Sequence, residues 1–219
     1  EVIANPLYKA LSQKIRELSW KLGLESEMSE AISQIVVSMN YDLMRIMDEN
    51  KFRSGDDLHE NFHMMDVIGT ISGTAIIFWI DPKSAVELLT PLWRASRIMY
   101  NLRDFGEDII ADLINIPKWE LHELGITDED IVRVKTLWKN LDFSQLPQSI
   151  KKWFRLEISA IIIALREHDN CMKQDFQFVD KPNFILRKWR NILLKKKILP
   201  QTYTKEIQKR VPEILTSVH

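Results

Sequence analysis

Apolar residues recur at three- and four-residue spacing along almost the whole chain, with little sustained alternation of apolar and polar residues. That spacing places apolar side chains on one face of an α-helix, whereas a half-buried strand alternates every second residue. Only 6 glycines and 8 prolines interrupt the 219 residues. The sequence therefore predicts an all-α fold, and its length suits a single domain over residues 1–219 with one sizeable core.

Proline, glycine and capping residues mark where the expected helices begin and end. Pro6 can open a first helix that runs to about Lys21, and Gly23 follows its end. Further helices are expected at 28–47, at 54–80, from 83 or 86 to just before Pro117 with a start or kink at Pro91, and at 119–124, 128–140, 148–172, 184–197 and 204–215. The helix that ends before Pro117 carries an acidic segment at 100–109.

The charge balance limits the classes of partner. Lys and Arg total 30 against 31 Asp and Glu, which leaves a formal net charge of -1. Such a chain has no general attraction to nucleic acid or to an anionic membrane, so we expect no nucleic-acid partner. Cys171 is the single cysteine, which excludes an internal disulfide, and the first residues lack a basic-then-apolar signal pattern. The expected location is therefore the reducing cytoplasm.

Carboxylates follow one another at four-residue spacing in the acidic segment: Asp104, Asp108 and Asp112, with Glu107 beside them. This spacing puts their side chains on one helical face, where like charges repel unless a cation neutralises them. Magnesium prefers carboxylate oxygen and typically joins one or two protein carboxylates to substrate phosphates. Arg103 could contact the same phosphate. From spacing alone, a solvated acidic face is the commoner outcome.

The segment L-R-D-F-G-E-D at 102–108 resembles the second aspartate-rich motif of the squalene/phytoene synthase family, commonly L-R-D-x-x-E-D. Three further blocks resemble family segments and keep the family order: S-M-N-Y-D-L at 38–43, V-I-G-T-I-S-G at 67–73 and L-I-N-I-P-K-W-E-L-H-E-L-G-I at 113–126. Together they extend the similarity over roughly residues 6–131. The later helices match the family in character more than in motifs.

The resemblance implies an isoprenoid-synthase-like helical bundle around an apolar cavity, with the acidic segment at its mouth. It implies a Mg²⁺-dependent enzyme of isoprenoid biosynthesis that joins prenyl diphosphates and releases diphosphate. Asp104 and Asp108 would bind Mg²⁺, and Arg103 would contact the diphosphate. The remaining substrate-binding positions that it implies are Asp42, Val67, Ile71 and Tyr100, of which Val67 and Ile71 would line the prenyl channel.

The chain departs from the family pattern in ways that leave alternatives open. Family members carry another aspartate-rich motif before the segment that matches 6–43, and D-D-L-H-E at 56–60 stands in the wrong place to replace it. We therefore expect an N-terminally incomplete version, completed by an upstream segment or a partner subunit. Tyr100 stands where the family has asparagine, and Asn101, displaced by about 100° around the helix, is not expected to inherit the ligand role. A non-catalytic binding or assembly protein that retains the fold is the alternative.

A lesser alternative is a zinc hydrolase. H-E-N-F-H at 59–63 satisfies the pattern in which two histidines one turn apart hold zinc and a glutamate activates water. No convincing third ligand is evident among His122, His168 and nearby carboxylates. Histidines on the polar face of a helix are the simpler interpretation.

A basic stretch near the C-terminus interleaves cations with apolar residues; it comprises Lys188, Trp189, Arg190, Leu193, Leu194, Lys195, Lys196 and Lys197. Such a stretch could touch phosphate or anionic lipid, so weak peripheral membrane contact is kept as a hypothesis. A solvated helix end is the commoner outcome. The tryptophans at 79, 93, 138, 153 and 189 fall at mostly apolar helical positions and are expected in the core.

Overall fold

A computed structural model of the chain describes residues 13–14, 16–17, 19–21, 23–47, 58–77, 80–139, 145–173 and 183–210. Some side chains within these helices, including those of Asp42, His59 and residues 183–190, are not part of this description. The elements in order are α2 Glu25–Met47, α3 Leu58–His63, the π-helix η2 Met64–Ser72, α4 Gly73–Ile77, α5 Pro82–Ile110, α6 Lys118–Leu124, α7 Asp128–Lys139, α8 Gln148–Lys173 and α9 Asn183–Arg210. No strand occurs among the described residues, so the all-α prediction is confirmed.

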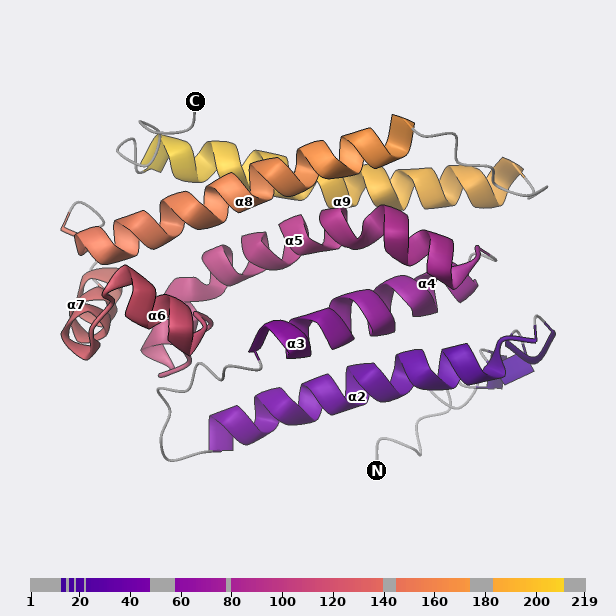
Figure 1. The fold of residues 1–219 in the computed structure, drawn as a ribbon, viewed down its shortest axis with the longest axis horizontal. Helices are drawn as coiled ribbons and strands as arrows, with labels where there is room; N and C mark the ends of the chain where they lie inside the picture. Colours follow the sequence, from indigo (N-terminus) through magenta and orange to yellow (C-terminus); the bar gives the residue numbers. More distant parts are fainter. Residues whose placement is uncertain are drawn as a thin grey trace.

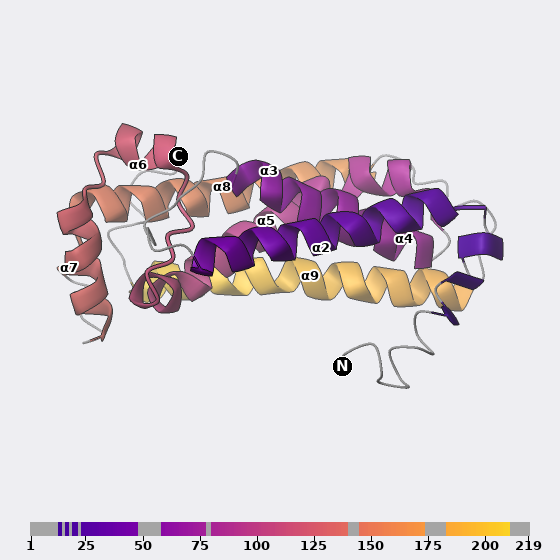
Figure 2. The same ribbon diagram turned by 90° about the horizontal axis from the view of Figure 1, so that it is seen from below.

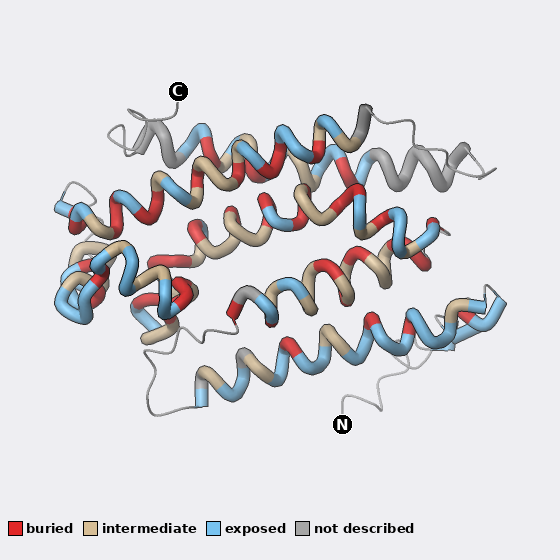
Figure 3. The backbone as a smooth tube through the Cα atoms, in the orientation of Figure 1, coloured by how far each residue is buried: buried red, intermediate tan, exposed pale blue. Residues whose placement is uncertain are grey.

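Helix α5 is the centre of the bundle, with α8 along one side and the α3–η2–α4 segment along the other (Figure 1). It contacts α8, η2, α9, α7 and α4. Helix α2 packs against η2 as the outermost layer, and α6 and α7 lie together at one end of the bundle (Figures 1 and 2). Buried residues line the facing sides of α5 and α8, whereas α2 is mostly exposed (Figure 3).

Local sequence explains where α5 begins and why it continues through a proline. Asp81 caps the helix by accepting a hydrogen bond from the Ser84 backbone N–H at 2.7 Å, and Pro82 follows in the first turn. Pro91 lies inside the helix and has no N–H to donate. The Thr90 hydroxyl, one residue earlier, donates to the Val86 carbonyl at 2.6 Å, but this bond does not replace the one that Pro91 lacks. Packing on α8 and η2 holds the helix together across this point.

The end of α5 differs from the prediction. The helix ends at Ile110 and does not continue to Pro117, because Asp112 adopts φ 62°, a left-handed conformation that cannot continue an α-helix. Asp112 forms an ion pair with Lys135 of α7. It therefore does not extend the acidic face of α5.

Two further segments differ from the prediction in part. The helix expected at 54–80 is continuous over 58–77, where α3, η2 and α4 follow one another without a break, but its middle part is a π-helix. Two helices were expected at 184–197 and 204–215. The structure has a single helix, α9, over Asn183–Arg210, and it passes through Pro200. Pro200 is buried and Tyr203 packs against the core, so tertiary packing outweighs the lost hydrogen bond. Most of the expected first helix lies outside the described residues.

The core beside the acidic segment is aromatic. Phe105 contacts Trp138, Trp153 and Phe154, with ring centroids 5.4, 5.0 and 5.3 Å away. Gly106 permits this approach, because a Cβ there would lie 1.5 Å from Trp138 Nε1. Trp93 and Trp153 are buried and Trp138 packs against the core, which confirms the prediction for these three. The cluster fixes the helix that carries the candidate site.

Candidate functional site

The C-terminal half of α5 places acidic side chains in a polar cavity of about 200 Å³. Asp104 and Asp108, one helical turn apart, both line it, as the sequence predicts for residues on one helical face. The other lining residues come from α2, α3, α5 and the segment after α5: Arg45, Phe62, Arg97, Tyr100, Asn101, Leu113 and Asn115. Carboxylates and guanidinium groups thus face a common space.

Asp104 is held by its neighbour. The Arg103 guanidinium donates to both Asp104 carboxylate oxygens, at 2.6 and 2.8 Å. This bond raises the pKa of Arg103 above its usual value. The guanidinium also lies over the Tyr100 ring, 4.8 Å from its centroid. Arg103 therefore neutralises Asp104 in this arrangement, and its guanidinium would reach an anion only after leaving that carboxylate.

Asp108 is less exposed and is held from the other side. The Asn115 side-chain amide donates to Asp108 Oδ2 at 2.7 Å. Burial, and next the charge of Asp104, raise the pKa of Asp108 above its usual value. Placing a cation between the two carboxylates would reverse that effect. The pair is thus an arrangement that gains from a bound cation.

Arg45 of α2 connects this site to the outer layer. Its guanidinium donates to the Ile114 carbonyl at 2.9 Å and to Asn115 Oδ1 at 3.1 Å. Asn115 in turn bonds Asp108, so a chain of hydrogen bonds joins α2 to the acidic face. We did not predict a role for Arg45 or Asn115. The periodicity of α2 and the segment after α5 contains no signal for this contact across 70 residues.

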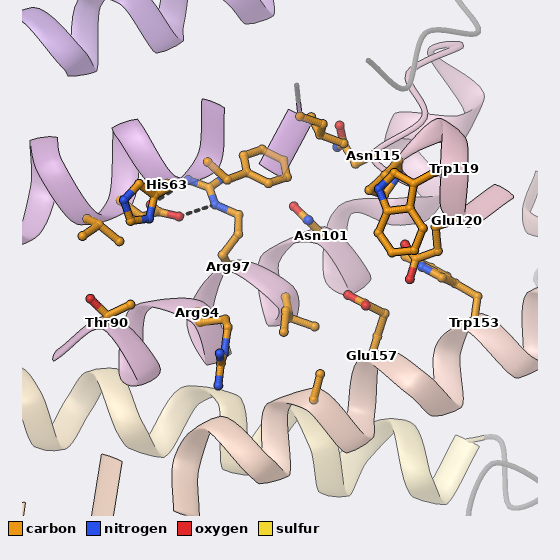
Figure 4. A pocket seen from close by; sticks show the side chains of 17 residues that line it. His63, Thr90, Arg94, Arg97, Asn101, Asn115, Trp119, Glu120, Trp153 and Glu157 are labelled. Atoms are coloured by element: carbon orange, nitrogen blue, oxygen red, sulfur yellow. Dashed lines mark hydrogen bonds and ion pairs between the residues drawn. The ribbon is translucent and has the colours of Figure 1, made fainter. Parts of the chain in front are cut away.

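A second, larger cavity of about 390 Å³ adjoins the polar one (Figure 4). Phe62, Arg97, Asn101 and Asn115 line both cavities and form the wall between them. Apolar and aromatic side chains make up most of the rest, with a few charged groups; the lining residues are Leu58, His63, Asp66, Val67, Thr90, Arg94, Ile98, Pro117, Trp119, Glu120, Trp153, Glu157 and Ala160. A ligand with an anionic head and an apolar body would suit this pair of cavities.

The wall between the cavities is rigidly built. Arg97 donates to both carboxylate oxygens of Asp66, at 2.6 and 2.8 Å, and lies over the Phe62 ring at 4.6 Å. Both partners of the ion pair are largely shielded from solvent, so salt screens their attraction less than that of an exposed pair. This contact joins α5 to η2 at the point where the cavities meet.

The other predicted substrate positions separate in the structure. Val67 lines the larger cavity and Tyr100 the polar one, whereas Ile71 is fully buried in the core and lines neither. The Asp42 side chain lies outside the described residues. Asn101, for which we expected no ligand role, lines both cavities. Its displacement around the helix turns it toward the boundary and not away from the site.

One comparison with known proteins found a relative. Over 112 aligned positions, this chain is 29% identical in sequence to phytoene synthase 1, chloroplastic, of Arabidopsis thaliana. The match covers 47% of this chain and 26% of the plant protein. No family model and no solved structure matches the chain.

The likeness to a phytoene synthase is distant and partial. The chain spans about a quarter of the length of the curated relative that it matches. The match agrees with the motif resemblance in the sequence.

Metal ligands beyond the acidic pair are scarce. Within the described part of the chain, no three His, Cys, Asp or Glu side chains come together in a way that could hold a metal ion. Asp104 and Asp108 nevertheless fit Mg²⁺ by donor type, because this ion often takes one or two protein carboxylates and completes its shell with phosphate and water. The shell would have to be completed from outside the described residues.

The zinc motif falls on α3 without a described third ligand. His63 is exposed and lines the larger cavity, while the His59 side chain lies outside the described residues. His122 is exposed on α6. His168 is buried on α8, where burial lowers its pKa and the Leu88 carbonyl lies 3.5 Å from its ring nitrogen. None of these observations favours a zinc centre.

Part of the basic stretch on α9 turns into the bundle. Lys196 lies over the Trp93 and Tyr100 rings, at 4.8 and 5.5 Å, and burial lowers its pKa. Lys197 forms an ion pair with Asp169 of α8. These two lysines are engaged with the protein, whereas Lys195 is exposed. None of the helices in the described part of the chain has the length and hydropathy that crossing a bilayer demands.

Proposed function

We propose that this chain binds a prenyl diphosphate and transfers its prenyl group with Mg²⁺ and release of diphosphate, as in squalene/phytoene synthase-type condensation. The observation that carries the proposal is the shared wall of the two cavities. On one side lie the Asp104 and Asp108 carboxylates, and on the other an aromatic and apolar space. The partial likeness to a phytoene synthase supports the same chemistry.

The polar cavity would hold the diphosphate. Asp104 and Asp108 would ligate Mg²⁺, and the metal would supply positive charge to the departing diphosphate. The Arg103–Asp104 contact must first open, since it occupies both oxygens of that carboxylate. Opening frees the carboxylate for the cation and the guanidinium for phosphate. Binding of metal and of diphosphate would therefore support each other.

The larger cavity would hold the prenyl chain. Leu58, Val67, Ile98 and Trp119 are among the side chains that would contact it. An apolar wall shields reactive carbon from water while the leaving group departs. Arg45 and Arg97 lie at the polar cavity, where their charge would favour an anionic head.

The acidic pair supplies carboxylates from one side only. A second set, from an upstream segment or a partner subunit, would complete the metal shell. Two observations motivate this second set of ligands. The family's first aspartate-rich motif is not found in these residues, and the match covers 26% of the plant protein.

The second candidate is a protein that binds such a ligand, or assembles with a partner, without turnover. One observation favours it: Arg103 neutralises Asp104 and donates to both of its carboxylate oxygens, which a metal would otherwise find free. A peripheral membrane contact through α9 also stays a proposal.

The test measures pyrophosphate release from farnesyl or geranylgeranyl diphosphate with Mg²⁺, with any upstream segment restored. Transfer predicts release, and Asp104→Ala or Asp108→Ala should lower it by roughly a hundredfold or more. Glu107→Ala is the matched control, because Glu107 is exposed on the same helix and lines neither cavity. Binding without release would favour the second candidate. Neither binding nor release would contradict both.

A further inference from the structure

One end of the larger cavity carries two carboxyl groups and two tryptophan side chains (Figure 4). Glu120 and Trp119 come from α6, and Glu157 and Trp153 from α8. We call these four residues the carboxylate end. None of the four lines the polar cavity, and Arg97 lies on the other side of Asn101 from them in Figure 4.

The arginines of this cavity are engaged elsewhere. Arg97 pairs with Asp66, and Arg94 pairs with Glu167 on α8. Among the described residues, no lysine or arginine forms an ion pair with Glu120 or Glu157. Two acidic groups thus face a largely apolar space without a cation from the protein.

This lack of a cation has an electrostatic consequence. Burial, and next the charge of Glu120, raise the pKa of Glu157 to about 8. Burial also raises the pKa of Glu120, an effect that the adjacent Trp153 partly offsets. The indole nitrogen of Trp153, a residue only 2% exposed, still makes no hydrogen bond of ordinary geometry. Glu157 thus lies in a shielded place where no opposite charge from the described residues favours its ionised form.

We propose that the carboxylate end binds a positively charged group carried by an apolar ligand. Carboxylates supply the counter-charge in a shielded site, and tryptophan is the aromatic ring that attracts cations best. The rest of the cavity, lined by Leu58, Val67 and Ile98, would hold the apolar part. A cationic ligand would share this apolar space with the prenyl chain of the proposed function, and its binding requires no turnover.

The first experiment compares a permanently charged probe with a neutral one. Octyltrimethylammonium and octanol are titrated into the full chain by calorimetry. The cation should bind about tenfold more tightly than the alcohol or better, because only the cation meets the carboxylates. Equal affinity, or no binding of the cation, would overturn the proposal. The assay does not involve pyrophosphate, so its failure is distinct from failure of the proposed function.

Isosteric variants locate the site. Glu120→Gln and Glu157→Gln remove charge and keep shape, and each should weaken cation binding by about tenfold while leaving the alcohol unaffected. Asp108→Asn is the control for the polar cavity and should leave cation binding unchanged. Loss of cation binding in Asp108→Asn alone would assign the probe to the other cavity and overturn the proposal.

Proton release is a readout that a purely structural role would not give. A cation beside Glu157 favours its ionised form, so binding near pH 7 should release a proton, seen as a dependence of the binding enthalpy on the buffer. The release should disappear in Glu157→Gln. The titratable and charged groups that line the cavity are His63, Asp66, Arg94, Arg97, Glu120 and Glu157. Release that persists in Glu157→Gln but disappears in Glu120→Gln would assign the proton to Glu120 and still support the site. Release that persists in both variants would assign the proton to a group outside the carboxylate end and contradict the proposal.

Discussion

Asp108 and Glu157 are both carboxyl groups whose pKa is raised by burial, and they line neighbouring cavities. Their surroundings differ. Asp108 accepts a hydrogen bond from Asn115, which favours its charged form, whereas the nearest charge to Glu157 is another carboxylate. The two groups therefore respond differently to pH and to cations.

Glu157 makes the folded state sensitive to alkaline pH. Its pKa rises from 4.5 to about 8 on folding, so between these values the folded chain holds a proton that the unfolded chain has lost. The free energy of unfolding should fall as pH rises through this window, by at most about 1.4 kcal/mol per pH unit. Glu157→Gln should remove this slope.

Urea unfolding at about pH 5 and about pH 9 measures that effect. The variant should gain stability relative to the parent at the higher pH. Glu123→Gln on the exposed side of α6 is the control and should follow the parent. Parallel curves for parent and Glu157→Gln would show that this carboxyl does not titrate as described.

Arg45 should contribute to stability as well as to the site. Arg45→Ala removes the hydrogen bonds to the Ile114 carbonyl and to Asn115, and leaves partly buried acceptors unpaired. We expect a loss of about 1–3 kcal/mol in the free energy of unfolding. Denaturant titration measures it, with the exposed Arg133→Ala as control. An equal effect of the two substitutions would argue against the hydrogen-bond chain.

At the scale of helices, the sequence predicts those boundaries that local caps and helix breakers determine. Boundaries that depend on contacts between helices could not be predicted from it. Helices α6, α7 and α8 begin and end close to the expected residues, since caps and breakers are local signals. The continuation of α9 through Pro200 is decided by contacts with α5 and α8. The turn at Asp112 also involves a distant contact, because Asp112 forms an ion pair with Lys135 of α7.

The candidate site shows the same division. Asp104 and Asp108 share a cavity because helical spacing is a local property. The packing of distant elements brings three further residues to the same cavity: Arg45, Arg97 and Asn115. The sequence around each of them contains no signal that predicts this contact. Glu120 and Glu157 also come from separate helices. Contacts between residues far apart in the sequence are what periodicity leaves undetermined.

The close packing of α5 on Trp138 predicts that a side chain at Gly106 destabilises the fold. Gly106→Ala would place a Cβ 1.5 Å from Trp138 Nε1, so the indole or the helix must move. We expect a loss of roughly 1–3 kcal/mol or more in thermal or urea unfolding. Gly73→Ala is the matched control, because its nearest neighbour would be Ala31 Cβ at an ordinary 3.6 Å. If Gly106→Ala were as stable as Gly73→Ala, the close approach would be wrong.

At the scale of the whole molecule, the central feature is the pair of cavities along α5. The polar cavity lies where α2, α5 and the segment after α5 meet, and the larger one extends between η2, α5, α6 and α8. The two cavities share four lining residues, so a ligand at their boundary would contact side chains of both.

The most direct test of the account is the binding of farnesyl thiodiphosphate, a slowly reacting analogue, measured by calorimetry with and without Mg²⁺. The account predicts binding that needs Mg²⁺ and weakens by about tenfold or more in Asp104→Ala and Asp108→Ala, but not in Glu107→Ala. Binding that is independent of Mg²⁺ and unchanged in both aspartate variants would contradict it.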